Sequence, residues 1–289
     1  MQPELDESLL TVIAGYLGAG KTTLINRMLQ QATQPFAVIV NDLGRLPVDA
    51  TLIATRASTT LTLTNGCACC QLQSDLAAQL LQLRQAKFSA VVLEASGVAK
   101  AGNLAAITGQ ADGYRLAKII TLVDGFAVEK QLNDAYLVAL VNEQIAVADF
   151  VVQTKIEASL NQTLKGLRPD AVGLLSHGPL PAYLSPNFVA SPRAVKVPLD
   201  APPMFQHRVI YPDGMIQPNA IEAFIARTPC IERVKGWLNT TEGGYLIQAT
   251  RRQFSAEPVS VVPQSGLQFI WRGDQELDFS LLIQAGPRN

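Results

Sequence analysis

The sequence has no excess of charge of either sign. Its 23 lysines and arginines nearly balance 24 aspartates and glutamates, which gives a net charge of −1. Since nucleic-acid-binding domains usually carry a clustered basic excess, this balance gives no support to a nucleic-acid partner. The sequence also contains no run of about 18 apolar residues, the length that a membrane-spanning helix needs. The acidic start MQPELDESLL lacks the basic and apolar segments of a secretory signal, so we expect a soluble cytoplasmic protein without nucleic-acid or membrane partners.

Histidine and cysteine are scarce. The two histidines, His177 and His207, stand apart in the sequence and are expected to be loop or strand residues rather than metal ligands. Of the four cysteines, three lie within residues 67–70 and the fourth is Cys230. This arrangement is no disulfide framework, and neighbouring thiols favour metal or redox chemistry in a reducing compartment. Cys230 stands alone at the start of a predicted strand and is expected to be structural.

The first 175 residues or so alternate short apolar runs with helical patterns. Five runs are rich in β-branched residues and apolar almost throughout, which is typical of strands buried on both faces of a parallel sheet. They cover residues 9–15, 36–42, 90–96, 118–124 and 149–154. Between them, apolar residues recur with the spacing of helices that pack on a sheet, at 21–32, 73–86 and 132–148. The alternation predicts a three-layer α/β domain with a mostly parallel sheet.

A change of pattern divides the chain into two predicted domains. Residues 178–203 hold seven of the 17 prolines, which indicates a stiff linker. The segment after the linker predicts a smaller α+β domain with an antiparallel sheet. Its expected strands lie at 205–212, 230–239, 245–254 and 267–273, with helices near 218–227 and 275–285. The expected organisation is a P-loop domain at 1–178, a Pro-rich linker at 179–203 and the second domain at 204–289.

Residues 15–23, GYLGAGKTT, match the phosphate-binding P-loop pattern G-x-x-x-x-G-K-[ST]. The match follows a predicted strand and opens a predicted helix, a context that a chance glycine-rich turn would lack. Backbone N–H groups of the loop and of the helix start would wrap the phosphates of a nucleotide. Lys21 would reach the β- and γ-phosphates, and the Thr22 hydroxyl would bind Mg²⁺. The other candidate nucleotide contacts in this loop are Gly15, Gly18, Ala19, Gly20 and Thr23.

Over nearly its whole length the chain resembles the CobW-like P-loop GTPases, relatives of the nickel-insertion GTPases of hydrogenase and urease maturation. The resemblance rests on GYLGAGKTTLIN (15–26), NDLG (41–44), NGCACCQL (65–72), EASG (94–97), LVDGF (122–126), NEQIAVAD (142–149) and the C-terminal segments KGWLNT and GGYLIQAT. It implies a P-loop NTPase fold and a GTP-hydrolysing protein that binds zinc or cobalt and delivers it to a metal-requiring client protein. A homodimer is retained as one assembly that the chain could form.

The resemblance also implies roles for residues near the P-loop. Asp42, where the family more often has Glu, lies in the segment that matches the first switch region and could meet Mg²⁺ or a bound metal; a strand-terminal turn residue is the alternative. Glu94 occupies the position that serves the Mg²⁺–water shell or places the attacking water, at the strand end where open α/β sheets bind ligands. Gly97 either lets its loop approach the γ-phosphate or is a simple turn glycine. Arg45 is a candidate arginine finger.

The metal motif comprises Cys67, Cys69 and Cys70, between the strand-like TLTLT and a predicted helix. Thiols just before a helix are biased towards the thiolate, which is the metal-binding form. Three soft ligands suit Zn²⁺, with Cu(I) as a competitor, and leave a fourth position for water, Asp42 or a client ligand. Such an open shell suits metal transfer. Buried structural cysteines or a disulfide are the alternatives.

The guanine-recognition segment departs from the N-K-x-D pattern of GTPases. Thr154, Lys155 and Glu157 stand at the matching positions. Lys155 is retained, Glu157 is one methylene longer than Asp, and Thr154 cannot reproduce the two-ended bracing of an Asn amide. GTP is therefore the expected nucleotide, with ATP or a relaxed preference as alternatives.

The resulting hypothesis is a cycle that couples a nucleotide to a metal. Binding of Mg²⁺-GTP would order the segment around Asp42 while the thiolates hold the metal, and slow hydrolysis assisted by Lys21 and Glu94 would favour metal release. Two alternatives remain open. One is a P-loop ATPase or kinase with structural cysteines, and the other is a nucleotide-gated interaction module without meaningful catalysis.

Overall fold

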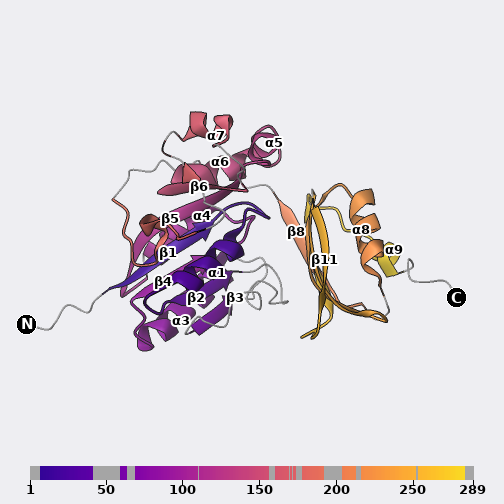
Figure 1. The fold of residues 1–289 in the computed structure, drawn as a ribbon, viewed down its shortest axis with the longest axis horizontal. Coiled ribbons are helices and arrows are strands. Elements are labelled where there is room, and N and C mark those ends of the chain that lie inside the picture. Colours follow the sequence, from indigo (N-terminus) through magenta and orange to yellow (C-terminus); the bar gives the residue numbers. More distant parts are fainter. Residues whose placement is uncertain are drawn as a thin grey trace, which may run out of the picture. The chain divides into compact units, whose positions relative to one another are not determined.

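The computed structural model describes most of the chain (Figure 1). The described residues are 7–41, 59–63, 69–109, 111–155, 160–168, 170, 172–173, 178–191, 204–212, 216–251 and 253–283. Those up to residue 191 belong to one compact unit and those from residue 204 onward to another. In the described part of the chain, no helix is both long enough and apolar enough to cross a membrane.

The first unit is built on a parallel sheet of seven strands in the order β3-β2-β4-β1-β5-β6-β7. The strands are β1 (Ser8–Ala14), β2 (Ala37–Asn41), β3 (Thr59–Leu63), β4 (Ala90–Glu94), β5 (Tyr114–Asp124), β6 (Phe150–Thr154) and β7 (Val172–Gly173). Every neighbouring pair runs parallel. The five strands expected in this region are therefore confirmed, and so is the parallel sheet.

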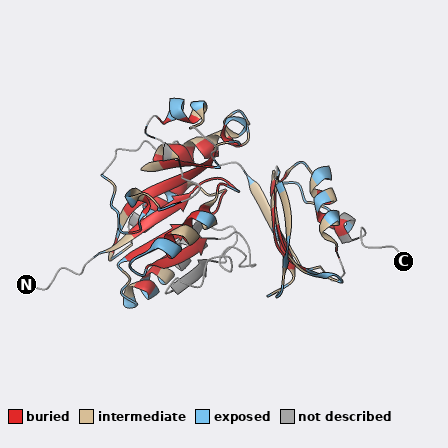
Figure 2. Ribbon diagram, in the orientation of Figure 1, coloured by how far each residue is buried: buried red, intermediate tan, exposed pale blue. Residues whose placement is uncertain are grey.

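Helices cover both faces of this sheet, as the three-layer prediction requires. The helices are α1 (Lys21–Gln31), α3 (Cys69–Gln85), α4 (Ala101–Gly109), α5 (Val128–Leu132), α6 (Val138–Val147) and α7 (Gln162–Leu167). One core cluster joins Val12 of β1 to Leu80 of α3, and a second joins Ile13 of β1 to Leu24 of α1. Successive side chains of a strand point to opposite faces, so β1 contributes side chains to both core clusters. Figure 2 shows the central strands buried between the helices.

The structure corrects the helix that was expected over residues 132–148. Only α6, at Val138–Val147, lies within that range, since residues 133–137 are a non-helical break and α5 ends at Leu132. In the break, the Asp134 side chain accepts a hydrogen bond from the backbone N–H of Tyr136 at 2.9 Å. Short polar side chains that bond to nearby backbone groups compete with helical hydrogen bonds, which accounts for the interruption.

The first half of the expected Pro-rich linker is packed against the first unit. Residues 178–191, which we call the strap, contain a short 3₁₀ helix at Ala182–Leu184. Leu184 is fully buried, and the ring of Tyr183 stacks on that of Phe150 with centroids 4.9 Å apart. Prolines interrupt the hydrogen bonding of helix and strand interiors, but they do not prevent neighbouring apolar side chains from packing. The expected linker at 179–203 thus begins with an ordered element of the first unit.

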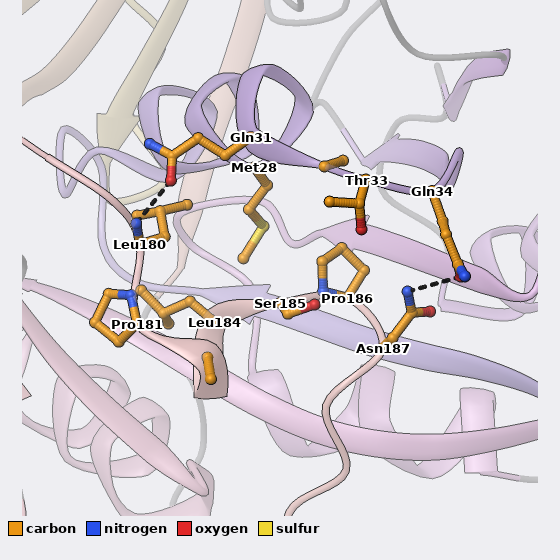
Figure 3. Close-up of a pocket in the computed structure, with 12 residues that line it drawn as sticks. Met28, Gln31, Thr33, Gln34, Leu180, Pro181, Leu184, Ser185, Pro186 and Asn187 are labelled. Carbon is orange, nitrogen blue, oxygen red and sulfur yellow. Dashed lines mark hydrogen bonds between the residues drawn. The ribbon is translucent and has the colours of Figure 1, made fainter.

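The strap also meets the C-terminal end of α1 around a cavity of about 120 Å³ (Figure 3). The backbone N–H of Leu180 donates to Gln31 Oε1 at 2.7 Å, and Asn187 Nδ2 donates to Gln34 Oε1 at 3.4 Å. These side-chain amides connect the strap to α1 and to the turn that follows it.

The second unit is an antiparallel sheet of five strands in the order β11-β10-β9-β12-β8. Its elements are β8 (Phe205–Ile210), α8 (Pro218–Arg227), β9 (Ile231–Thr240), β10 (Gly243–Thr250), β11 (Gln253–Val259), β12 (Gly266–Arg272) and α9 (Ser280–Ile283). Phe224 of α8 packs on Phe269 of β12 in the core. The α+β prediction is confirmed. The strand expected at 245–254 was wrong, because a turn divides it between β10 and β11.

A buried lysine anchors the strap to the sheet. Lys118 of β5 is only 1% exposed. Its Nζ donates to the carbonyl oxygens of Ser185 at 2.7 Å and Phe188 at 2.5 Å, and it lies 5.6 Å from the centroid of the Phe188 ring. Burial lowers the pKa of Lys118 to about 8, while the Asp149 carboxylate opposes this shift.

Replacing this lysine should change how stability depends on pH. Because its pKa is lower in the folded protein, the contribution of Lys118 to the free energy of unfolding is lost as the pH falls from 10.5 to about 8. Raising the pH across this interval should therefore increase the free energy of unfolding of the unaltered protein, relative to that of Lys118→Met, by up to about 3 kcal/mol. Urea unfolding of both proteins at several pH values measures this difference. A difference that stays constant would contradict a buried, destabilised ammonium group.

Candidate functional site

The candidate site lies at the carboxyl ends of neighbouring strands in the first unit. Parallel register pairs Ile13 of β1 with Glu94 of β4, and Asp124 of β5 with Thr154 of β6. The loops that follow β1, β4, β5 and β6 therefore leave the sheet at the same edge. Ligands bind at this edge in open α/β sheets.

The P-loop joins β1 to α1 through glycines that adopt left-handed backbone angles. Gly15, Gly18 and Gly20 have φ values of +135°, +78° and +96°. A Cβ atom on Gly15 would lie 2.3 Å from the carbonyl oxygen of Leu122 in β5. The loop therefore requires glycine at its first position, both for its backbone angle and for its close approach to the neighbouring strand.

Lys21, the first residue of α1, is folded back over this loop. It is 6% exposed, and its Nζ donates to the carbonyl oxygens of Gly15 at 2.8 Å and Tyr16 at 3.4 Å. Gly20 caps the helix without a side-chain hydrogen bond, and the first turn contains no acidic residue. A buried cation beside a helix N-terminus makes an electropositive cradle, which suits an anion such as a phosphate.

Thr22 and Glu94 form an oxygen-rich pair beside the P-loop. Thr22 Oγ1 donates to Glu94 Oε1 at 3.0 Å, and Glu94 is 4% exposed. The two residues are 72 positions apart in the chain and are brought together by the pairing of β1 with β4. A hydroxyl and a carboxylate are hard oxygen ligands, so the residues present fit a Mg²⁺ ion.

The loop after Glu94 presses against the P-loop. The backbone N–H of Ala95 donates to the carbonyl oxygen of Ile13 at 2.8 Å. A Cβ atom on Gly97 would lie 2.8 Å from the backbone nitrogen of Leu17 and 2.6 Å from its Cδ2 atom. Gly97 is therefore required by close contact between two loops and not by an ordinary turn.

Thr154 ties the end of β6 to the P-loop. Its Oγ1 lies 2.8 Å from the carbonyl oxygen of Ala19 and 3.4 Å from that of Val123. A hydroxyl has one proton, so the shorter contact is the stronger hydrogen bond. The residue at the position of the expected Asn thus braces the P-loop from one end.

Asp124 forms an ion pair with Lys155, the lysine of the guanine-recognition segment. Lys155 has a φ of +56°, and its Nζ donates to Asp124 Oδ2 at 2.8 Å. Asp124 Oδ1 accepts from the backbone N–H of Phe126 at 3.0 Å. Sequence reasoning assigned Asp124 no role, although it lies in the LVDGF motif. Its position at the end of a buried strand was the available signal.

Two residues of the NEQIAVAD motif were also missed as contributors to the site. Glu143 and Gln144 of α6 are each 1% exposed; Gln144 donates to the segment that follows Glu94, and Glu143 accepts hydrogen bonds from the first residues of α4, where that segment ends. Polar residues in the middle of a mostly apolar helical pattern were the available signal in the sequence.

Several candidate residues lie outside the described part of the structure. Asp42, Arg45, Cys67 and Glu157 are among them. Cys69 and Cys70 are the first two residues of α3, and only their backbone is described. Within the described residues, no group of three or more His, Cys, Asp or Glu side chains could hold a metal ion. The thiol metal site therefore stays a prediction.

Cys230 and His207 belong to the second unit. Cys230 is a free, partly buried thiol just before β9. His207 lies in β8, and burial lowers its pKa. Their roles stay as the sequence predicts them, structural rather than metal-binding.

Residues 9–171 match the family model described as "CobW/HypB/UreG, nucleotide-binding domain". The matched range includes the P-loop, Glu94 and the Thr154–Lys155 segment. It covers more than half of the chain.

Named relatives are similar over part of their length. A zinc chaperone, YjiA of Escherichia coli, is 34% identical over 161 residues, which are 52% of this chain and 50% of the relative. A "zinc-regulated GTPase metalloprotein activator 1" of Dictyostelium discoideum is 31% identical over 139 residues, covering 40% of this chain and 29% of the relative. The solved structure of Zn(II)-bound YjiA GTPase from E. coli has a TM-score of 0.48 at 21% identity, covering 98% of this chain and 99% of that one. The chain thus spans at most about half the length of these two curated relatives.

Removing the Thr154 hydroxyl should destabilise the site. Thr154→Val keeps the shape of the side chain but leaves the buried Ala19 carbonyl without its donor, so we expect the free energy of unfolding to fall by about 1–3 kcal/mol. Thr154→Ser keeps the donor and should lose about 1 kcal/mol or less. Urea unfolding measures both. A valine variant as stable as the unaltered protein would contradict the brace.

Proposed function

Because the chain belongs to the CobW/HypB/UreG family, we propose that it is a GTP-hydrolysing metallochaperone, which couples GTP binding and hydrolysis to the transfer of zinc or cobalt to a client protein. The observation that carries the proposal is the Thr22–Glu94 pair beside a well-formed P-loop, in a chain that also has three clustered cysteines. The names of the relatives support zinc as the cargo.

The P-loop side of the site would bind the triphosphate. Backbone N–H groups of the loop would cradle the phosphates, and Lys21 would exchange its carbonyl partners for phosphate oxygens. Thr22 and Glu94 would hold Mg²⁺, which when bound neutralises charge on the transferred phosphoryl group. Glu94 would also orient the attacking water. The remaining nucleotide contacts would come from Gly15, Gly18, Ala19, Gly20, Thr23 and Gly97.

The base would bind against the segment after β6. The Lys155 ammonium group is bound by the Asp124 carboxylate, which sets the direction of the lysine hydrocarbon chain. A purine ring could lie along this chain. Glu157 would accept hydrogen bonds from guanine, which favours GTP. Glu157 is one methylene longer than Asp, and Thr154 braces the P-loop from one end only. We therefore expect the preference for GTP over ATP to be weaker than an N-K-x-D segment would give. A P-loop ATPase with structural cysteines is therefore the second candidate.

Metal would be bound by the thiolates of Cys67, Cys69 and Cys70, with Asp42 as a candidate fourth ligand. Cys69 and Cys70 open α3, and thiols at a helix N-terminus are biased towards the thiolate. A soft three-thiolate set suits Zn²⁺, and an exchangeable fourth position would allow the metal to pass to a client.

Substitution of the paired thiols tests the metal site. Cys69→Ser/Cys70→Ser should weaken Zn²⁺ binding by at least about 100-fold, because two of three soft ligands are lost. Cys230→Ser, in the second unit, is the matched control and should leave the affinity unchanged. Competition of each protein with a chromophoric zinc chelator measures the affinity. Equal zinc affinity of the double variant and the control would contradict the cysteine site.

A further inference from the structure

The segment between β4 and α4, residues 95–100, directly follows Glu94 and contacts the P-loop through Gly97. Its contacts with the sheet and the P-loop are the Ala95–Ile13 hydrogen bond and the packing of Gly97 on Leu17. Any displacement of this segment would therefore move the residues that surround the Thr22–Glu94 pair.

Gln144 of α6 holds the segment from the other side. Its Nε2 donates to the carbonyl oxygen of Ala99 at 2.9 Å and lies 3.5 Å from that of Gly97. The backbone carbonyl of Gln144 itself accepts from Thr121 Oγ1 of β5 at 2.6 Å. The backbone of Gln144 is thus bound to the central sheet, and its side-chain amide donates to the loop beside the P-loop.

Glu143 fixes the end of the same segment. Its Oε2 accepts from the backbone N–H of Ala101 at 3.1 Å, and its Oε1 accepts from that of Gly102 at 2.8 Å. Burial raises the pKa of Glu143, while these two N–H donors and the nearby Lys100 charge oppose the shift. The carboxylate therefore uses both of its oxygen atoms to cap α4, where the segment ends.

We propose that Glu143 and Gln144 are positioning residues for nucleotide hydrolysis, which hold residues 95–100 against the P-loop so that Glu94 and Gly97 face the γ-phosphate. This inference rests on the proposed function. Phosphoryl transfer depends mainly on positioning and charge neutralisation, and a distant substitution that misplaces the reacting groups by about 1 Å can cost about 100-fold in rate. A purely structural pair would stabilise the fold without selectively affecting hydrolysis.

The test uses variants that remove single hydrogen bonds. Gln144→Met keeps an unbranched side chain of similar length but has no donor for Ala99. Glu143→Gln replaces one of the two acceptor oxygens with a donor and so loses one of the two hydrogen bonds to the first backbone N–H groups of α4. Ile145→Val is the matched control, since Ile145 is a buried residue of the same helix whose truncation costs about 0.5–1.5 kcal/mol in stability.

Single-turnover GTP hydrolysis, GDP affinity and urea unfolding are measured for each protein. We expect Gln144→Met to lower the hydrolysis rate about 10- to 100-fold while GDP affinity stays within about twofold. Glu143→Gln should show a smaller loss of the same kind and serves as the second variant if Gln144→Met does not fold. Ile145→Val should hydrolyse GTP normally. Unchanged hydrolysis in both variants, or a loss shared by Ile145→Val, would overturn the inference.

Failure of the proposed function gives a different result. If the unaltered protein binds GTP without hydrolysing it, the proposed hydrolysis fails, and the ratio of the affinities for a non-hydrolysable GTP analogue and for GDP decides the inference. A fall of that ratio in Gln144→Met supports γ-phosphate positioning, and an unchanged ratio overturns it. Absence of any nucleotide binding by the unaltered protein would overturn both proposals.

Discussion

The parallel register of β4, β1, β5 and β6 is the constraint on which the site depends. It pairs Ile13 with Glu94 and Asp124 with Thr154, so that residues far apart in the chain end their strands at one edge. The P-loop crosses this edge and requires glycine where it approaches β5. A shift of register by one residue would turn each of these side chains to the other face of the sheet.

The polar residues of the site are buried, and backbone groups supply much of their hydrogen bonding. Lys21, Glu94 and Thr154 are 6%, 4% and 5% exposed. Lys21 and Thr154 donate to P-loop carbonyls, while Gln144 donates to the segment after β4 and Glu143 accepts from the start of α4. Burial of polar groups is costly unless they are hydrogen-bonded, so these networks also fix the loops in one arrangement. Such fixed loops are what a reaction that depends on positioning requires.

Much of the fold could be predicted from the sequence because its signals are local. Apolar β-branched runs predicted the strands, and the glycine and lysine spacing predicted the P-loop. The break near Asp134 and the packing of Leu184 were missed because they depend on a local side-chain bond and on tertiary contacts. The partner of Thr154 lies 135 residues away, and no local pattern contains that contact. The cysteine metal site was predicted by its spacing and lies largely outside the described residues.

The coupling of nucleotide and metal is the central claim, and a calorimetric titration tests it most directly. Purified protein is titrated with non-hydrolysable GTP and ATP analogues in the presence of Mg²⁺, with and without one equivalent of Zn²⁺. The account predicts that the GTP analogue binds more tightly than the ATP analogue and that Zn²⁺ shifts this affinity, as linked sites require. Equal affinities for both analogues that Zn²⁺ leaves unchanged would contradict it.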